Sequence, residues 1–201
     1  MTTLAILKTD IAAWAARSDL DAYIPTFVRL CESRIRKVVR IPEMEASEDL
    51  ALTAQTVNLP TGFMKMRRIY SDSTTNRPLE YMTPELAWSD ANFAAPGAPV
   101  AYTIEGATLS VFPYAANYIA KINYIKAFDA LVDDADTNWL LINAYDVYLY
   151  GCLMEMKAFI EDDVSVQKWS AAFGEAVSEL NRAGNSQRSG AILRKTGVTS
   201  P

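Results

Sequence analysis

The stretch Thr137–Ile160 has the densest hydrophobic pattern in the chain, and its apolar residues recur every three or four positions, as on the buried face of a helix. The residues with this spacing are Leu141, Tyr145, Tyr148, Cys152, Met156 and Phe159. The other faces are also largely apolar, so the pattern predicts one helix enclosed on several sides, with Thr137 as its N-cap. We expect neighbouring helices to cover part of it and a second subunit to cover the rest.

The same stretch does not have the pattern of a membrane span. Its longest uninterrupted apolar run, Val147–Met154, is much shorter than the roughly 20 residues that a bilayer requires. Polar residues interrupt the remainder of the helix. The sequence therefore predicts no membrane partner.

Two further helices are expected before Pro42, one over Thr3–Arg17 and one over Asp21–Arg40. The second has an apolar face that contains Cys31 and an opposite face that is basic. The residues of this basic stripe are Arg29, Arg36, Lys37 and Arg40. The stripe is either a solvated helix face or a surface that contacts DNA or an acidic neighbour.

Between Glu45 and Phe128 the periodicity changes to short alternating runs separated by turn residues, which predicts strands. The expected strands are Ala46–Leu52, Thr56–Leu59, Met66–Ser71, Pro78–Met82, Ala101–Glu105, Thr108–Phe112 and Tyr118–Ile125. One short helix, Pro84–Asn92, is expected among them. Short strands at this density are typical of a compact β-sandwich.

After the main helix, the acids Glu161–Asp163 form a turn, and a last helix is expected from a Ser165 cap to Gly184. The final stretch, Asn181–Pro201, is rich in small and polar residues and contains basic residues but no acid. This composition is typical of a segment that is disordered alone. It is either an idle terminus or a segment that folds onto a partner.

These patterns predict an α+β protein: a helical bundle of about four helices with an inserted antiparallel β-sandwich domain and an extended C-terminal tail. The bundle domain comprises residues 1–44 and 129–184, the β-sandwich domain residues 45–128, and the tail residues 185–201. At 22.2 kDa the chain is long enough for one domain with such an insertion.

Candidate chemistry is sparse. The chain has no histidine, which removes His-dependent nucleophile activation and the commonest metal ligand. Asp134–Asn138 begins like a calcium loop, but Trp139 stands where that loop needs glycine. Glu161–Asp163 offers carboxylates for glycoside hydrolysis, although adjacent acids in a turn usually just repel and solvate one another. We expect no catalytic residue, no metal and no cofactor.

Four blocks of sequence occur in a characteristic order. They are FVRLCESRIRKVVRIPEME, VNLPTGFMKMRRIY, APVAYTIEGATLSVFPYA and TNWLLINAYDVYLYGCLMEMKAFIEDD, with a tryptophan in the following helix. Over roughly residues 20–182 the chain resembles the head-to-tail adaptor family of tailed bacteriophages, the connector or head-completion proteins related to the tail tubular A type.

The resemblance implies a structural virion protein at the head–tail neck, made in the host cytoplasm. It implies a homo-oligomeric ring of about twelve copies, closed by head-to-tail contacts, that binds below the portal protein and extends the DNA channel to tail or nozzle proteins. The net charge of −5 suits passage of genomic double-stranded DNA without sequence-specific binding, because an acidic wall repels phosphates. The alternatives are a tail-side stopper or tail-completion protein, a carboxylate-dependent hydrolase, and a stand-alone oligomeric binding module.

Two sets of site residues follow as hypotheses. By position, the C-terminal segment would bind the portal, through Arg188, Ile192, Leu193, Arg194 and Lys195. The subunit interface would combine the basic stripe with apolar residues of the main helix, namely Trp139, Leu140, Tyr150 and Met154. The stripe would face acids of the adjacent subunit, with Asp133, Asp134 and Asp136 as candidates.

Overall fold

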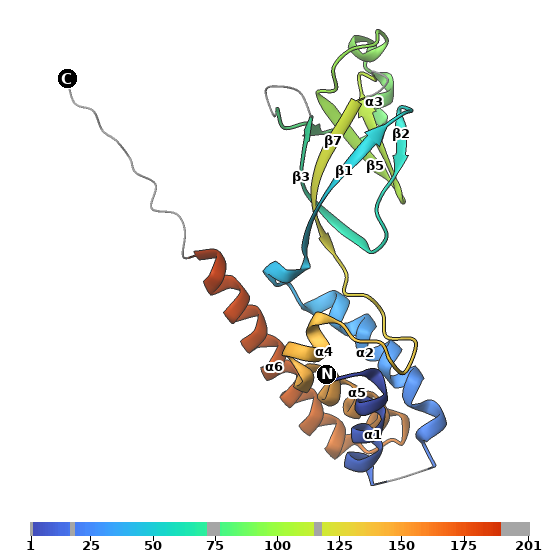
Figure 1. The fold of residues 1–201 in the computed structure, drawn as a ribbon, viewed down its shortest axis with the longest axis vertical. Helices are drawn as coiled ribbons and strands as arrows, with labels where there is room; N and C mark the ends of the chain where they lie inside the picture. The colour runs from blue at the N-terminus through green and yellow to red at the C-terminus, as the bar shows by residue number, and fades with distance from the viewer. Residues whose placement is uncertain (1, 17–18, 72–76, 115–117, 190–201) are drawn as a thin grey trace, which may run out of the picture. The chain divides into compact units, whose positions relative to one another are not determined.

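The computed structural model describes residues 2–16, 19–71, 77–114 and 118–189. The chain divides into two compact units, Met1–Glu43 with Phe128–Pro201 and Met44–Ala127. The first is the helical unit and the second is the β unit (Figure 1). Helices and two sheets in one chain confirm the predicted α+β class.

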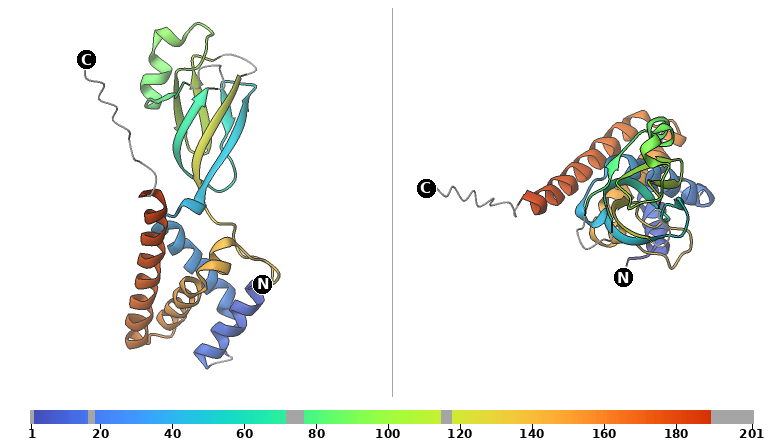
Figure 2. Two further views of the ribbon diagram at one scale, coloured as in Figure 1. Left: turned by 60° about the vertical axis from the view of Figure 1, so that its left-hand side comes forward. Right: turned by 90° about the horizontal axis from the view of Figure 1, so that it is seen from above.

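One helix forms the centre of the helical unit. The elements described in this unit are α1 (Leu4–Ala15), η1 (Asp21–Tyr23), α2 (Ile24–Val38), α4 (Trp139–Asn143), α5 (Tyr145–Phe159) and α6 (Asp163–Ser189). Helix α5 packs against α1, α2, α4 and α6, and the views in Figure 2 show these helices gathered around it. The helices before and after the β unit therefore share one core.

The chain itself covers nearly every face of α5. Its buried residues are Val147, Tyr148, Leu149, Gly151, Cys152, Leu153, Met154, Glu155 and Met156. In the apolar run Val147–Met154, only Tyr150 is half-buried, and its ring stacks on Trp169 of α6 with 5.7 Å between centroids. The expectation that a second subunit must cover this helix is therefore wrong, because α1, α2, α4 and α6 are together sufficient.

The main helix also differs from the predicted single helix that begins at Thr137. It is interrupted at Ala144, and the Asn143 side-chain amide donates to the Trp139 carbonyl at 2.8 Å, in competition with the helical backbone bond. The N-cap is Asn138, whose Oδ1 accepts from the Leu141 amide at 2.9 Å.

The last helix is longer than predicted, since it continues through Gly184 to Ser189. A Cβ at Gly184 would lie only 2.9 Å from Pro42 Cδ, so glycine allows close packing here and does not end the helix. The predicted tail therefore begins inside α6, and residues 190–201 lie outside the described part of the chain. The cap is Asp162, because its carboxylate accepts from the Ser165 amide at 3.2 Å.

Helix α2 ends two residues earlier than predicted, at Val38, because α6 caps it. The Asn181 side chain donates to the Val38 carbonyl at 3.0 Å and accepts from the Arg40 amide at 2.8 Å. One residue thus satisfies two backbone groups at the end of α2. This contact fixes the C-terminal half of α6 to the helix that precedes the β unit.

The β unit consists of two small sheets that face each other. Its elements are β1 (Glu45–Leu52), β2 (Thr56–Asn58), β3 (Phe63–Ser71), β4 (Glu80–Tyr81), α3 (Pro84–Ser89), η3 (Ala91–Phe93), β5 (Ala101–Glu105), β6 (Thr108–Phe112) and β7 (Tyr118–Lys126), with η2 (Pro42–Met44) at its start. The strand orders are β1-β7-β3 and β2-β6-β5-β4. The pairing is antiparallel except between β4 and β5, which are parallel, so the expectation of an antiparallel sandwich holds for every other strand pair described.

Alternating side chains of both sheets fill the core of the β unit. The buried residues of this core are Leu50, Leu52, Ile69, Leu79, Leu109, Val111, Ala120, Ile122 and Tyr124. Strand β7 is central in its sheet, and β3 pairs with it through two register shifts, one between Phe63 and Lys65 and one between Met66 and Arg68. The strands β1 and β3 are consequently the edges of this sheet.

Candidate assembly surfaces

The basic stripe of α2 lies on the surface, as the sequence predicts. Arg29, Arg36, Lys37 and Arg40 are all exposed, and none of them takes part in an ion pair within the described residues. Arg29 donates to the Thr26 hydroxyl at 3.2 Å, and Arg40 donates to the Arg36 carbonyl at 2.9 Å. Arg29 and Arg40 are thus held close to α2, although Arg40 lies two residues beyond its end at Val38, and the role of the stripe in subunit contact stays a prediction.

The apolar residues predicted for the subunit interface lie mainly inside the helical unit. Leu140 is 0 % exposed and Met154 is 5 % exposed, so neither offers a surface to a neighbour. Trp139 is half-buried and stacks on Phe128 at 6.1 Å, with the two rings nearly parallel. The hypothesis fails for Leu140 and Met154 because the chain's own helices take the contacts that it assigned to a second subunit.

The acids before α4 hold the N-terminus of α1. The carbonyl oxygens of Asp136 and Asp134 accept from the amides of Leu4 and Ala5, each at 3.0 Å. The Asp134 carboxylate also pairs with Lys8 at 2.6 Å. Because the first amides of a helix have no partner within it, this loop takes the place of a side-chain cap.

Asp136 closes the same loop. Its carboxylate accepts from the Val132 and Asp133 amides, both at 2.8 Å, and these hydrogen bonds hold its pKa below the usual range. In the segment that begins like a calcium loop, the Asp136 oxygen Oδ2 therefore serves two backbone amides and the Asp134 carboxylate serves Lys8. Within the described residues, no group of three or more His, Cys, Asp or Glu side chains is placed to hold a metal ion.

Asp162, the middle residue of the acid turn Glu161–Asp163, has the wrong electrostatics for an acid catalyst. Hydrogen bonds from Ser165 lower the pKa of Asp162, and Lys157 lies 3.5 Å from its carboxylate. A glycosidase requires one carboxyl group whose pKa is raised so that it stays protonated. Asp162 is instead held as the charged cap of α6.

A buried polar network connects the loop before α4 to α2 and α5. The Asn138 amide donates to the Tyr148 hydroxyl at 2.8 Å, and the Glu32 carboxylate accepts from the Leu131 amide at 2.9 Å. Burial raises the pKa of Glu32 and of Tyr148. The sequence pattern does not reveal this role of Glu32, because the Leu131 amide is distant along the chain and gives no local signal.

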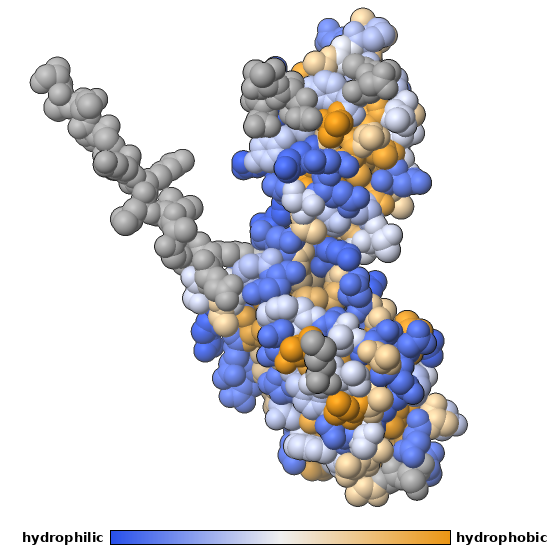
Figure 3. All heavy atoms as spheres, viewed as in Figure 1, coloured by the Kyte–Doolittle hydropathy of each residue, from blue (hydrophilic) through white to orange (hydrophobic). Residues whose placement is uncertain are grey.

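A groove on α2 is a surface that the sequence pattern misses. It has a volume of about 380 Å³ and is lined by Leu30, Ser33, Arg34, Lys37, Val38, Glu155 and Phe173. Arg34 forms an ion pair with the buried carboxylate of Glu155 in its wall. Leu30 and Val38 remain 45 % and 43 % exposed. On the near face of the helical unit, hydrophobic residues form small patches separated by hydrophilic ones (Figure 3).

The residues predicted to bind a portal are only partly within the described chain. Arg188 belongs to the last turn of α6, and its side chain is not described. Ile192, Leu193, Arg194 and Lys195 lie outside the described residues. Their role stays a prediction from position and charge.

Within the described residues, the conspicuous charged and polar side chains cap helices, close loops, join a buried network or lie on exposed faces, an arrangement expected of a structural protein. A family model described as SU10 adaptor protein matches residues 2–195, and the chain belongs to this family. The match confirms the predicted resemblance to phage head-to-tail adaptors. No curated protein matches the chain.

The family is one of phage structural adaptors and not of enzymes, and its members are virion components that assemble with portal and tail proteins. None of the described helices combines the length and the hydrophobicity needed to span a bilayer.

Proposed function

We propose that this chain is a head-to-tail adaptor that assembles as a closed ring below the portal and extends the DNA channel to the tail. The observation that carries the proposal is the family match over residues 2–195, which includes both units and the linkers between them. Helix α5 is covered by its own chain, so the subunit is expected to fold alone and to assemble afterwards through surface contacts.

The basic stripe of α2 supports a contact between subunits. Its four cations are exposed, and none has an ion-pair partner in the described part of its own chain. Exposed acids occur elsewhere on the same unit, among them Asp133 and Asp134. A ring brings different patches of identical copies together, so a basic patch on one copy meets an acidic patch on the next.

The overall charge supports passage of DNA without retention. The chain carries a net charge of −5, and an acidic channel wall repels phosphate groups. Each Lys or Arg that contacts a phosphate would instead add affinity and hold the genome in place. We infer that the chain lets DNA pass without reading its sequence and that its function is geometric.

The C-terminal segment is proposed to bind the portal. Residues 190–201 contain Arg194, Lys195 and the aliphatic pair Ile192–Leu193, and no acid. A basic segment with a small apolar anchor suits an acidic groove, and its ordering on binding would make assembly sequential. The family match includes this anchor because it reaches residue 195.

Electron microscopy and light scattering of the purified chain, with and without portal protein, test the proposal. We expect monomers or small oligomers alone and a ring of about a dozen copies on the portal, as closed assemblies of identical subunits require. A chain that remains monomeric and does not bind portal would refute the proposed function.

Deletion of residues 190–201 tests the C-terminal segment. The truncated protein should keep its thermal midpoint and lose portal binding, whereas a control that lacks only residues 196–201 keeps Ile192–Lys195 and should bind. Normal binding by the longer deletion would show that another surface contacts the portal.

Substitution of Arg36 and Arg40 by Glu should weaken ring formation while the subunit stays folded.

A further inference from the structure

The sheet β1-β7-β3 has two edge strands, and within the described residues of the β unit no strand pairs with the first half of either edge. Strand β7 separates β1 from β3, and in the register Glu45 lies opposite Ile125 and Phe63 opposite Lys126. Both edge strands therefore begin at the end of the sheet where β7 finishes. An edge strand presents backbone N–H and C=O groups that can pair with another strand.

The opposite end of each edge is partly occupied. On β3, the Leu79 amide donates to the Ile69 carbonyl at 3.0 Å, and Tyr70 forms a bridge with Pro78. On β1, the Ala51 carbonyl accepts from the Thr53 amide at 3.2 Å as the chain turns toward β2. The open parts of the two edges are consequently the first halves of β1 and β3.

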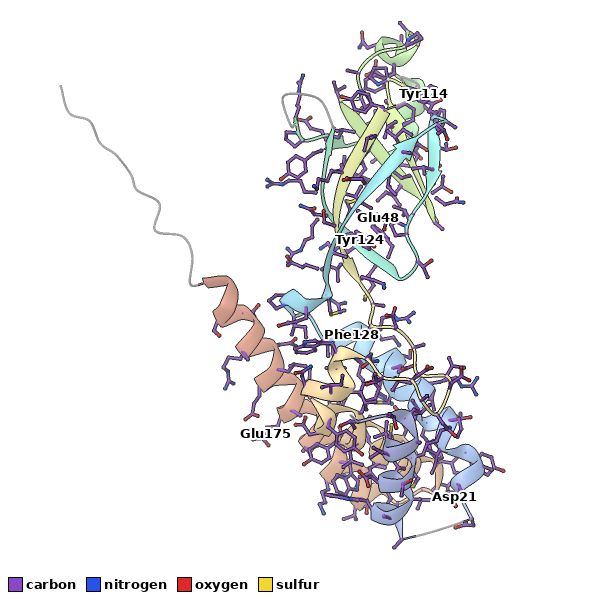
Figure 4. The ribbon with its side chains drawn as sticks, in the orientation of Figure 1. Asp21, Glu48, Tyr114, Tyr124, Phe128 and Glu175 are labelled. Atoms are coloured by element: carbon purple, nitrogen blue, oxygen red, sulfur yellow. The ribbon has the colours of Figure 1, made fainter. Side chains whose placement is uncertain are left out.

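These first halves carry opposite charges. Strand β1 contributes Glu45, Glu48 and Asp49, and β3 contributes Lys65, Arg67 and Arg68; all six are exposed. Figure 4 shows Glu48 projecting from β1 close to Tyr124 of β7, whose hydroxyl donates to the Glu48 carboxylate at 3.3 Å. The sheet thus has an acidic edge and a basic edge.

Charges at sheet edges commonly prevent aggregation, because edges with charge of one sign repel copies of themselves. Edges of opposite sign do not have this effect, since the acidic edge of one copy attracts the basic edge of another. The attraction already acts within one sheet, where Arg67 reaches Glu45 at 3.0 Å. That pair is about half exposed and in water, so it is weak and can exchange for a partner on another copy.

The directions of the strands also suit a ring. Both β1 and β3 are antiparallel to β7, so they are parallel to each other. Copies that share one orientation around an axis bring β3 of one copy to β1 of the next in parallel alignment. Such a contact joins two different surfaces and repeats from copy to copy, as a closed ring requires.

We propose that the basic edge of β3 binds the acidic edge of β1 on a second copy of this chain, by strand addition supported by Lys65 and Arg68 on one side and Glu48 and Asp49 on the other. This contact rests on the proposed function in one respect, because the ring supplies the common orientation. The paired edges of β1 and β3 would be a surface that joins neighbours in that ring.

A pair of charge-reversed variants tests the contact. The first carries Lys65→Glu with Arg68→Glu, and the second carries Glu48→Lys with Asp49→Lys. In each variant the two edges carry a net charge of the same sign, although Arg67 remains on β3 in the first and Glu45 remains on β1 in the second. Self-association in the presence of portal should therefore weaken at least about tenfold. Mixed in equal amounts, the two variants should assemble again, because each acidic edge then meets a basic edge of the other variant.

Recovery on mixing distinguishes a lost contact from a lost fold, since a misfolded variant does not recover. The control, Glu80→Lys with Glu105→Lys, makes the same charge change as the second variant on exposed residues of the other sheet and should assemble normally. Single variants that assemble like the natural chain, or a mixture that fails to assemble, would overturn the inference. Failure of the natural chain to assemble would instead count against the proposed function.

Carbodiimide cross-linking of mixed ¹⁴N and ¹⁵N copies gives a second measurement. We expect Lys65 to link to Glu48 or Asp49 between peptides of different isotope, because strand addition places these side chains together. Links confined to peptides of one isotope, or links that avoid both strands in assembled rings, would overturn the inference.

Discussion

The helical unit and the β unit differ in how they use their polar and charged residues. In the helical unit, Asn138, Asp162 and Asn181 satisfy the ends of helices, and Glu155 is buried against Arg34. In the β unit, the charges gather on the exposed edges of one sheet. In the assembly proposed above, the helical unit uses many polar groups for its own stability and offers the basic stripe of α2 to a neighbour, whereas the β unit offers the charged edges of one sheet.

Truncation of a core residue in the helical unit should have the largest effect. Leu153→Ala removes a side chain that is 0 % exposed at the centre of the bundle, and we expect a loss of about 2–5 kcal/mol in the free energy of unfolding. Leu86→Ala in α3 of the β unit is the control, because Leu86 is 59 % exposed, and it should cost less than about 1 kcal/mol. Urea denaturation followed by circular dichroism measures both values, and equal losses would contradict the comparison.

Close packing around α5 gives the next effect. A Cβ at Gly151 would lie 2.4 Å from Cys31 Sγ and 3.2 Å from the Phe173 ring, so Gly151→Ala should destabilise the chain by about 1–3 kcal/mol. Gly174 of α6 has no such neighbour within 4 Å, and Gly174→Ala should stabilise by about 0.5–1 kcal/mol. Thermal unfolding of the two variants should shift in opposite directions; a tolerated Gly151→Ala would show that α2 and α5 are not tightly packed.

Removal of the α4 cap should come third. Asn138→Ala deletes the acceptor of the Leu141 amide and the donor to Tyr148, and the expected cost is about 1–2 kcal/mol. Thr137→Ala tests the cap that the sequence pattern predicts, and it should cost less because this hydroxyl donates only to the exposed Thr2 carbonyl. The denaturant midpoints of the two variants show which residue is the N-cap. A larger loss for Thr137→Ala would support Thr137, the cap that the sequence pattern predicts.

The smallest effect concerns Glu32. Burial raises its pKa above the ordinary value, so its protonated form is favoured in the folded chain, and the stability that it contributes at low pH is lost as pH rises through the folded pKa. Glu32→Gln keeps an acceptor for the Leu131 amide without the charge. We expect the variant to be as stable as the natural chain or slightly more stable at pH 7, and to lose less stability between acid and neutral pH. A steeper loss in the variant, measured by thermal unfolding across that range, would contradict this assignment.

The local sequence pattern was sufficient to predict whether a segment forms a helix or a strand, but not which other segments it packs against. Alternation and turn residues predict β5 and β6 at their observed bounds, because these signals act over a few residues. For the apolar faces of Val147–Met154, no local signal identifies the partner that buries them. Hydrophobicity alone does not say whether the same chain or another copy covers these faces. Gly184 is a similar case, since a packing glycine and a C-cap glycine look alike in sequence.

The assembly surfaces were predictable in part for the same reason. The basic stripe of α2 follows from helical spacing within one segment, and its residues are exposed as expected. The opposite charges of β1 and β3 mark two edges of one sheet only because β7 lies between these strands. That order depends on long-range strand pairing, which the local pattern does not give. Leu140 and Met154 were assigned to an interface because their coverage by distant helices has no local signal.

The loop that holds the N-terminus of α1 has a consequence for synthesis on the ribosome. Leu4 and Ala5 bond to Asp136 and Asp134, and the core of α1 and α2 is completed by α5, which ends at Phe159. At 5–20 residues per second, the ribosome needs roughly 6–23 s to travel from Glu43 to Phe159. The contiguous β unit is complete once Ala127 has been made, within that interval, and can fold while the first two helices wait for α5. The nascent chain would therefore mature from its middle outward.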